Sequence, residues 1–153
     1  MSSVLAIESA ATTTRGPVNK QAVMQGAFLL VLGVLGFIPG ITSDYDELGT
    51  FHSGAHLFGV FTVSLVISSV LILFGITLLV FAGSVRQAHK AAVLSAVVLF
   101  AMGIAGAGIV ADSSAPVLAT NAATNWLFMG LGLVFLATST RARAQHVKEY
   151  GVF

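Results

Sequence analysis

The longest stretch of this sequence without a formal charge covers residues 48–85, which contain no Asp, Glu, Lys or Arg. A segment of that length cannot supply the water-facing side of a soluble protein, because soluble surfaces depend on charged side chains. The whole chain is also poor in charge, since 8% of its residues are charged and 56% are hydrophobic. In a soluble domain about a quarter of the residues are charged. The sequence therefore predicts an integral membrane protein.

The charge balance and the lack of cysteine exclude several classes of function. Seven basic and six acidic residues leave a formal net charge of +1, which offers no basic patch for the phosphates of a nucleic acid. With no cysteine in the chain, disulfides, thiolate metal sites and cysteine nucleophiles are excluded as well. We therefore expect membrane lipids, and no nucleic acid, among the partners.

Four apolar stretches are long enough to cross a bilayer as helices. Such a helix needs about 20 residues, because every backbone polar group inside lipid must be bonded within its own segment. The predicted spans are 22–41, 53–84, 91–111 and 122–138. They predict an all-α fold, an integral membrane four-helix bundle. The four-helix domain, a flexible N-terminal tail and a C-terminal tail are expected at residues 21–140, 1–20 and 141–153, respectively.

Two features of the first two spans set their expected ends. The middle of the second span, residues 61–81, has no Pro, Asn or Asp and no turn dipeptide that would reverse the chain. We therefore expect a single helix there, which must tilt or project beyond the bilayer because of its length. The first span closes on Pro39 and Gly40, since proline disfavours a helical residue before it and glycine accepts a left-handed backbone.

The basic residues predict the orientation of the bundle. They occur before the first span, between the second and third spans and after the fourth span: Arg15, Lys20, Arg86, Lys90, Arg141, Arg143 and Lys148. The other two loops carry acidic residues and no basic ones. Because cytoplasmic loops are enriched in Lys and Arg, we expect both termini to be cytoplasmic.

Small residues on the spans are expected to form the contacts between helices. Helices in a bilayer associate where small side chains let two backbones approach closely. The third span carries the pairs Ala101/Ala105 and Gly103/Ala107, and the fourth span offers Gly130 and Gly132. This pattern indicates packing and does not by itself indicate a path for a substrate.

Two histidines and several carboxylates gather on the predicted outer side. His52 and His56 are four residues apart, and in a helix this spacing places both imidazoles on one face, where they could hold one metal ion. Carboxylates of the outer loops could add oxygen ligands or orient an imidazole. The candidate metal ligands are His52, His56, Asp44, Asp46, Glu47 and Asp112. Two histidines alone do not define a site, so metal or haem ligation is one of two interpretations.

The second interpretation is structural, and it makes the same region a polar clasp between the second and fourth helices. Its residues are His52, His56, Asn121, Asn125 and Trp126. Asn121 is placed to cap the fourth helix, and Asn125 is placed to hydrogen-bond to the second helix, for instance to a histidine. Trp126 suits the headgroup layer. We favour the clasp over a ligand site.

Three segments resemble one known family. They are LGVLGFIPG at 32–40, HSGAHLFGV at 52–60 and NAATNWLFMGLGL at 121–133. Together they are similar to the bacterial four-helix membrane proteins catalogued as domain of unknown function 4383. The chain departs from that pattern at Phe128, where the family often has a histidine, which weakens the ligand interpretation. The resemblance implies a four-helix fold and a bacterial plasma (inner) membrane location, and it implies no function because the family has no established activity.

The function that we predict is that of a non-enzymatic accessory or structural subunit, in a homo-oligomer or a larger membrane complex. No predicted span has an ionisable residue at its centre, and no nucleophile and base show a catalytic spacing. We therefore expect no catalytic residue, and the sequence requires no cofactor. Two alternatives are a metal- or haem-binding component that uses the histidine pair, and a small channel or carrier for a neutral or lipidic solute.

Overall fold

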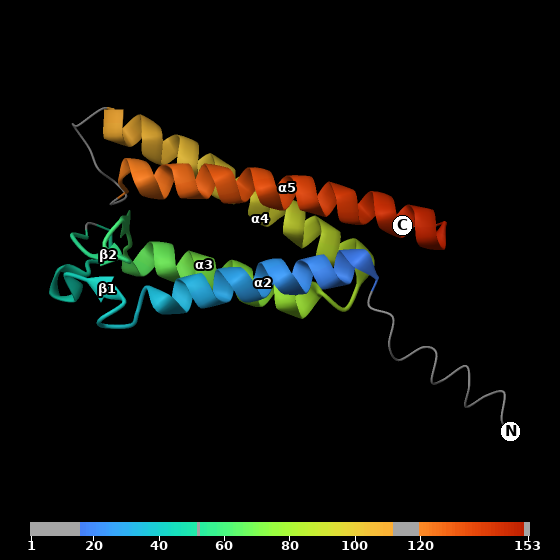
Figure 1. The fold of residues 1–153 in the computed structure, drawn as a ribbon, viewed down its shortest axis with the longest axis horizontal. Coiled ribbons are helices and arrows are strands. Elements are labelled where there is room, and N and C mark those ends of the chain that lie inside the picture. Colours follow the sequence, from blue (N-terminus) through green and yellow to red (C-terminus); the bar gives the residue numbers. More distant parts are fainter. Residues whose placement is uncertain (1–15, 52, 112–119, 152–153) are drawn as a thin grey trace, which may run out of the picture.

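The computed structural model of the chain describes residues 16–51, 53–111 and 120–151. Across these residues it forms four α-helices, namely α2 (Pro17–Leu35), α3 (Leu65–Phe81), α4 (Val85–Ala111) and α5 (Ala122–Tyr150). The helices run up and down along one long axis (Figure 1). The predicted all-α fold is confirmed.

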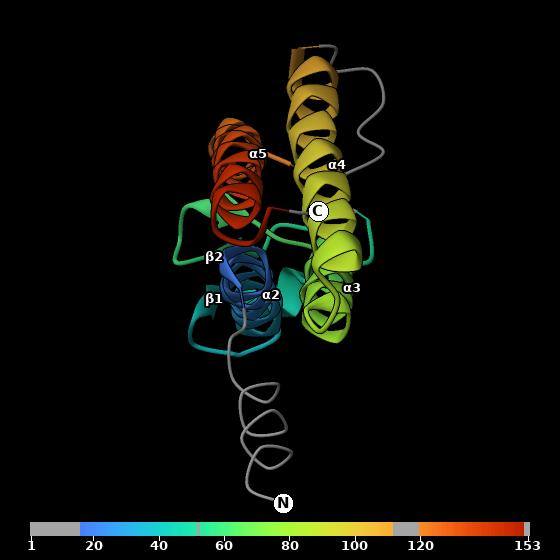
Figure 2. The same cartoon turned by 90° about the vertical axis from the view of Figure 1, so that its right-hand side faces the viewer.

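The four helices pack as two antiparallel pairs. One pair is α2 with α3 and the other is α4 with α5, because these helices share the most extensive contacts. The end view shows how the pairs stack, with α5 lying over α2 and α4 lying over α3 (Figure 2). Glycines bring the backbones together within each pair. A Cβ on Gly75 of α3 would lie 2.6 Å from the backbone nitrogen of Leu30 in α2, a separation that no side chain can occupy.

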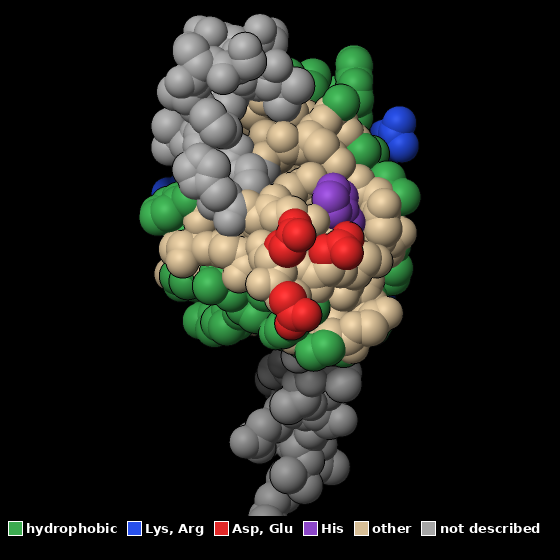
Figure 3. Space-filling view, turned by 90° about the vertical axis from the view of Figure 1, so that its left-hand side faces the viewer, with side chains coloured by type: hydrophobic (Ala, Val, Ile, Leu, Met, Phe, Trp, Pro, Cys, Tyr) green, Lys and Arg blue, Asp and Glu red, His purple; other side chains and the backbone are tan. Residues whose placement is uncertain are grey.

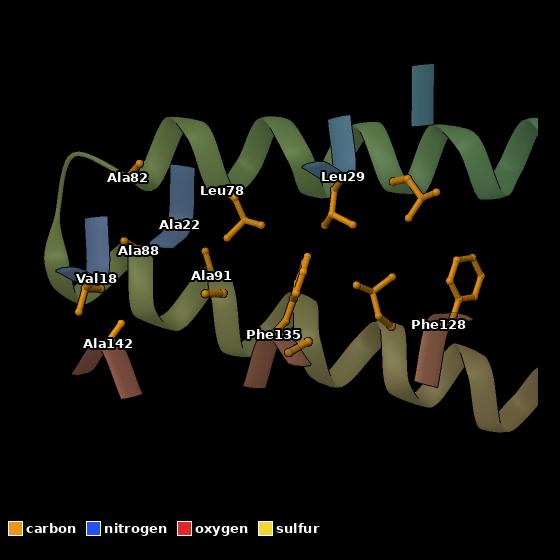
Figure 4. Close-up of a cluster of buried hydrophobic side chains, with 14 of the residues drawn as sticks. Val18, Ala22, Leu29, Leu78, Ala82, Ala88, Ala91, Phe128, Phe135 and Ala142 are labelled. Carbon is orange, nitrogen blue, oxygen red and sulfur yellow. The ribbon is translucent and has the colours of Figure 1, made fainter. Parts of the chain in front are cut away.

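A continuous hydrophobic core fills the space between the two pairs. Leu29, Leu78 and Phe135 come from three different helices and point toward one another (Figure 4). Toward the termini the core narrows to small side chains such as Ala88 and Ala142, which let the helices converge there.

The outward faces of all four helices are apolar, as a lipid environment requires. Exposed side chains include Val31 on α2, Leu73 on α3, Leu94 on α4 and Leu133 on α5. Among the described residues, α2, α4 and α5 are long and apolar enough to span a bilayer, and α3 is an apolar helix of 17 residues. The bundle is therefore a membrane domain.

The second helix is shorter than the sequence predicted. In place of one helix over 53–84, α3 begins at Leu65, and a small antiparallel sheet precedes it. Its strands, in the order β1-β2-β3, are Thr42–Ser43, His56–Leu57 and Phe61–Thr62. Phe58 and Gly59 reverse the chain between β2 and β3 with positive φ angles of 53° and 70°. The prediction failed because Phe58 is a bulky residue that rarely adopts this conformation.

A serine cap fixes the residue at which α3 begins. Ser64 has an extended backbone, and its hydroxyl accepts a hydrogen bond from the backbone nitrogen of Ile67 at 3.2 Å. This is an N-cap, which satisfies a donor that has no partner inside the helix. The cap therefore places the helix boundary at Ser64.

The other helix ends also differ from the predicted spans. Helix α2 begins at Pro17 and ends at Leu35, before the expected end at 41, although Gly40 does adopt a positive φ of 94°. Helix α4 begins at Val85. Helix α5 continues through most of the expected tail to Tyr150, because Ala142 and His146 are buried on that extension. The N-terminal tail falls largely outside the described residues.

Candidate functional site

Charged residues separate to the two ends of the bundle. The acidic end holds the three-stranded sheet and the 3-10 helix Tyr45–Glu47, with Asp44, Asp46 and Glu47, and Figure 3 shows acidic side chains gathered there. The basic end holds the start of α2, the turn between α3 and α4, and the end of α5. Its described basic residues are Lys20, Arg86, Lys90, Arg141, Arg143 and Lys148. Both ends of the described chain lie at the basic end (Figure 1).

The predicted histidine pair does not lie on a helix. His56 is in β2, where it pairs with Ser43 of β1 and Thr62 of β3. His52 falls outside the described residues. The expectation that the second helix holds both imidazoles on one face is therefore wrong, because His56 lies in a strand and α3 begins only at Leu65.

The described carboxylates at the acidic end are exposed and do not form a three-ligand metal site. Asp44, Asp46 and Glu47 are all solvent-exposed, and the Glu47 carboxylate lies against the backbone of Gly54, where a Cβ would overlap it. Within 16–51, 53–111 and 120–151, no three His, Asp or Glu side chains are close enough to hold a metal ion. Asp112, the remaining candidate ligand, lies outside the described residues.

The first turn of α5 is tied to the sheet by two polar side chains. The Asn121 side-chain oxygen accepts from the backbone nitrogen of Thr124 at 2.8 Å, and its Nδ2 donates to the Val60 carbonyl at 2.8 Å. Thr124 is buried, and its hydroxyl donates to the Thr62 carbonyl at 3.1 Å. Asn121 therefore caps the helix as expected, but the connection runs to the strand β3 and not to the helix α3.

Asn125 occupies a different environment from the expected one. Its side chain is 2% exposed, and neither amide atom has a hydrogen-bond partner among the described residues. The amide faces α4, where a Cβ on Gly106 would overlap the Asn125 Oδ1. Trp126 points outward and is 71% exposed, a position that suits the lipid interface. Asn125 therefore packs between α4 and α5 and does not reach a histidine.

Two amide side chains that the sequence pattern did not single out join α2 to its neighbours, Gln25 to α5 and Asn19 to the end of α3. Gln25 is 3% exposed in the middle of α2, and its Nε2 donates to the Phe135 carbonyl at 3.2 Å and to the Thr138 hydroxyl at 3.1 Å. Asn19 Nδ2 donates to the Ala82 carbonyl at the end of α3. Gln25 had a sequence signal, a neutral amide inside the predicted span 22–41, which must find a partner when no water is present. Asn19 had none, because it fell in the predicted N-terminal tail.

The segments that resemble the known family come together in space. Residues 32–40 leave α2, residues 52–60 contain β2, and residues 121–133 begin α5, so all three meet at the acidic end. The Thr42 hydroxyl donates to the Leu35 carbonyl at 3.2 Å, which ties the sheet to the first of them. Residues 20–140 of the chain match the family described as Domain of unknown function (DUF4383). The chain belongs to this family.

The family match covers the whole bundle of this DUF4383 protein except the helix ends nearest the termini. It begins in the first turn of α2 and ends in α5, and it confirms the resemblance read from the three segments. Neither the curated proteins nor the solved structures include a match to the chain.

Proposed function

We propose that this DUF4383 protein is a non-enzymatic accessory or structural subunit of a bacterial plasma-membrane complex, with both termini in the cytoplasm. The observation that supports the proposal is that polar side chains at the acidic end hydrogen-bond to the protein's own backbone. The side chains of Thr42, Tyr45, Asn121 and Thr124 each donate to a backbone carbonyl of the same chain. These bonds hold the sheet onto the helices, which is a structural task.

The apolar outer faces support the same proposal. Large apolar side chains are exposed on each of the four helices. A partner within the bilayer therefore has a broad surface to pack against and needs no polar site for binding. Helices in a membrane associate through such surfaces when their shapes match. A subunit of this kind contributes surface and rigidity to an assembly.

Native mass spectrometry of the untagged protein, extracted gently from its own membrane, tests the proposal. We expect a stoichiometric companion protein or a defined homo-oligomer. A single chain without a partner at every detergent concentration would contradict the subunit role. The same spectrum would show a bound metal or haem, and such a mass would favour the alternative function built on His56 and the acidic residues.

A further inference from the structure

A groove at the basic end combines an apolar interior with a positively charged mouth. It lies between α3 and α4 and has a volume of about 270 Å³. Its lining residues are Thr77, Phe81, Gln87, Lys90, Ala91 and Leu94. Ala91 has the smallest side chain of the six and is buried.

The interior of the groove is suited to an apolar group of a ligand. The Thr77 hydroxyl already donates to the Leu73 carbonyl at 2.7 Å, and Phe81 and Leu94 present hydrocarbon. A second hollow of about 340 Å³ lies along α4 and shares Lys90 and Leu94 with the first. These two residues therefore form a ridge with an apolar hollow on either side.

Lys90 lines the groove, and a second cation, Arg86, lies one helical turn before it in α4. Arg86 and Lys90 are exposed and four residues apart in α4, a spacing at which like charges repel. Neither residue forms an ion pair within the described part of the chain. Of the described acidic residues, only Glu149 lies toward this end. An external anion that reached both residues would be attracted by both charges and would relieve this repulsion.

We propose that an anionic phospholipid binds here, with its phosphate between Arg86 and Lys90 and its acyl chains in the hollows beside the Leu94 ridge. Charge complementarity selects a lipid over a second copy of the chain, because the matching surface of a copy would bring the same two cations. The amide of Gln87 adds a neutral donor at the mouth. This site is independent of the subunit role proposed above.

Lipid retention measured by native mass spectrometry tests the site. The purified full-length chain is mixed with phosphatidylglycerol or phosphatidylcholine in detergent, and the lipid-bound fraction is compared. We expect preferential retention of phosphatidylglycerol, and a roughly fivefold weaker retention in Lys90→Gln. Thr77→Phe, which fills the groove without changing charge, should reduce retention of the same lipid.

The control is Lys148→Gln, which removes an exposed cation of the basic end outside the groove. It should leave retention unchanged. Equal retention of the two lipids would overturn the proposal, and so would an equal loss in Lys148→Gln and Lys90→Gln, which indicates diffuse attraction. If Thr77→Phe does not fold, Leu94→Ala serves in its place, because it removes the ridge between the hollows.

Discussion

At the scale of single residues, two asparagines one helical turn apart have opposite energetic roles. Asn121 satisfies a free backbone donor of α5 and also donates to the Val60 carbonyl. Asn125 is buried, and neither of its amide atoms has a hydrogen-bond partner in the described part of the chain; an unsatisfied buried group opposes folding. The same side chain is therefore stabilising at one position and costly at the other.

Substitution of each asparagine by alanine should separate these roles. We expect Asn121→Ala to lower the free energy of unfolding by about 2 kcal/mol, because it loses both a cap and a second hydrogen bond. Asn125→Ala should change it by less than about 1 kcal/mol, since lost packing is offset by removal of an unpaired amide. Thermal unfolding in detergent measures both.

Asn121→Asp is the matched control for the first substitution. An aspartate keeps the cap and removes the Nδ2 donor, so its effect should fall between wild type and Asn121→Ala. A larger loss in Asn125→Ala than in Asn121→Ala would contradict this assignment of roles.

At the scale of elements, the contact between α4 and α5 depends on which glycines face the partner helix. A Cβ on Gly132 would lie 2.7 Å from the Ala96 carbonyl oxygen, whereas a Cβ on Gly130 would meet no atom within 4 Å. Gly103 likewise faces α5, while Ala101 and Ala105 are exposed. Small residues therefore contribute to packing only on the face that meets the neighbouring helix.

A pair of alanine substitutions on α5 should show this difference. Gly132→Ala must push α4 and α5 apart and should cost about 1–3 kcal/mol of stability. Gly130→Ala should be neutral or stabilising by up to about 1 kcal/mol, because alanine favours the helix more than glycine does. Both are compared by thermal unfolding under one detergent condition, and equal effects would contradict the packing described here.

At the scale of the whole molecule, the segregation of charge defines two chemically different ends. The acidic end is closed by a sheet whose strands are two residues long, and the basic end is formed by helix ends and one tight turn. Basic residues favour the cytoplasmic side of a membrane. The orientation proposed above, with both termini inside the cell, would therefore place the sheet outside it.

Single cysteines test this orientation, since the chain has none of its own. Ser43→Cys lies on β1 and Gln145→Cys on the last turns of α5, and both native side chains are exposed. A membrane-impermeant thiol reagent should label the first in intact cells and the second only after lysis. The reverse pattern would overturn the orientation.

Much of the architecture was predictable from composition and periodicity. The apolar stretches predicted four helices because a backbone in lipid must bond to itself, and the positions of Lys20, Arg86 and Arg141 predicted a shared basic end. The amide of Asn121 predicted a helix cap. Each of these conclusions depends on neighbours in the sequence or on the solvent, so no knowledge of the tertiary fold was needed.

The sheet and the partners of the polar side chains were decided by tertiary structure alone. Residues 53–62 were expected to belong to the helix because they carry no charge and run into the apolar stretch 61–81, which lacks a turn signal, but pairing with β1 places His56 in a strand. Asn125 packs against α4 at Gly106, and among the described residues its amide has no hydrogen-bond partner. Such outcomes depend on which backbone segments approach one another in the folded chain. Contacts between segments far apart in the sequence cannot be predicted from the local preferences of single residues.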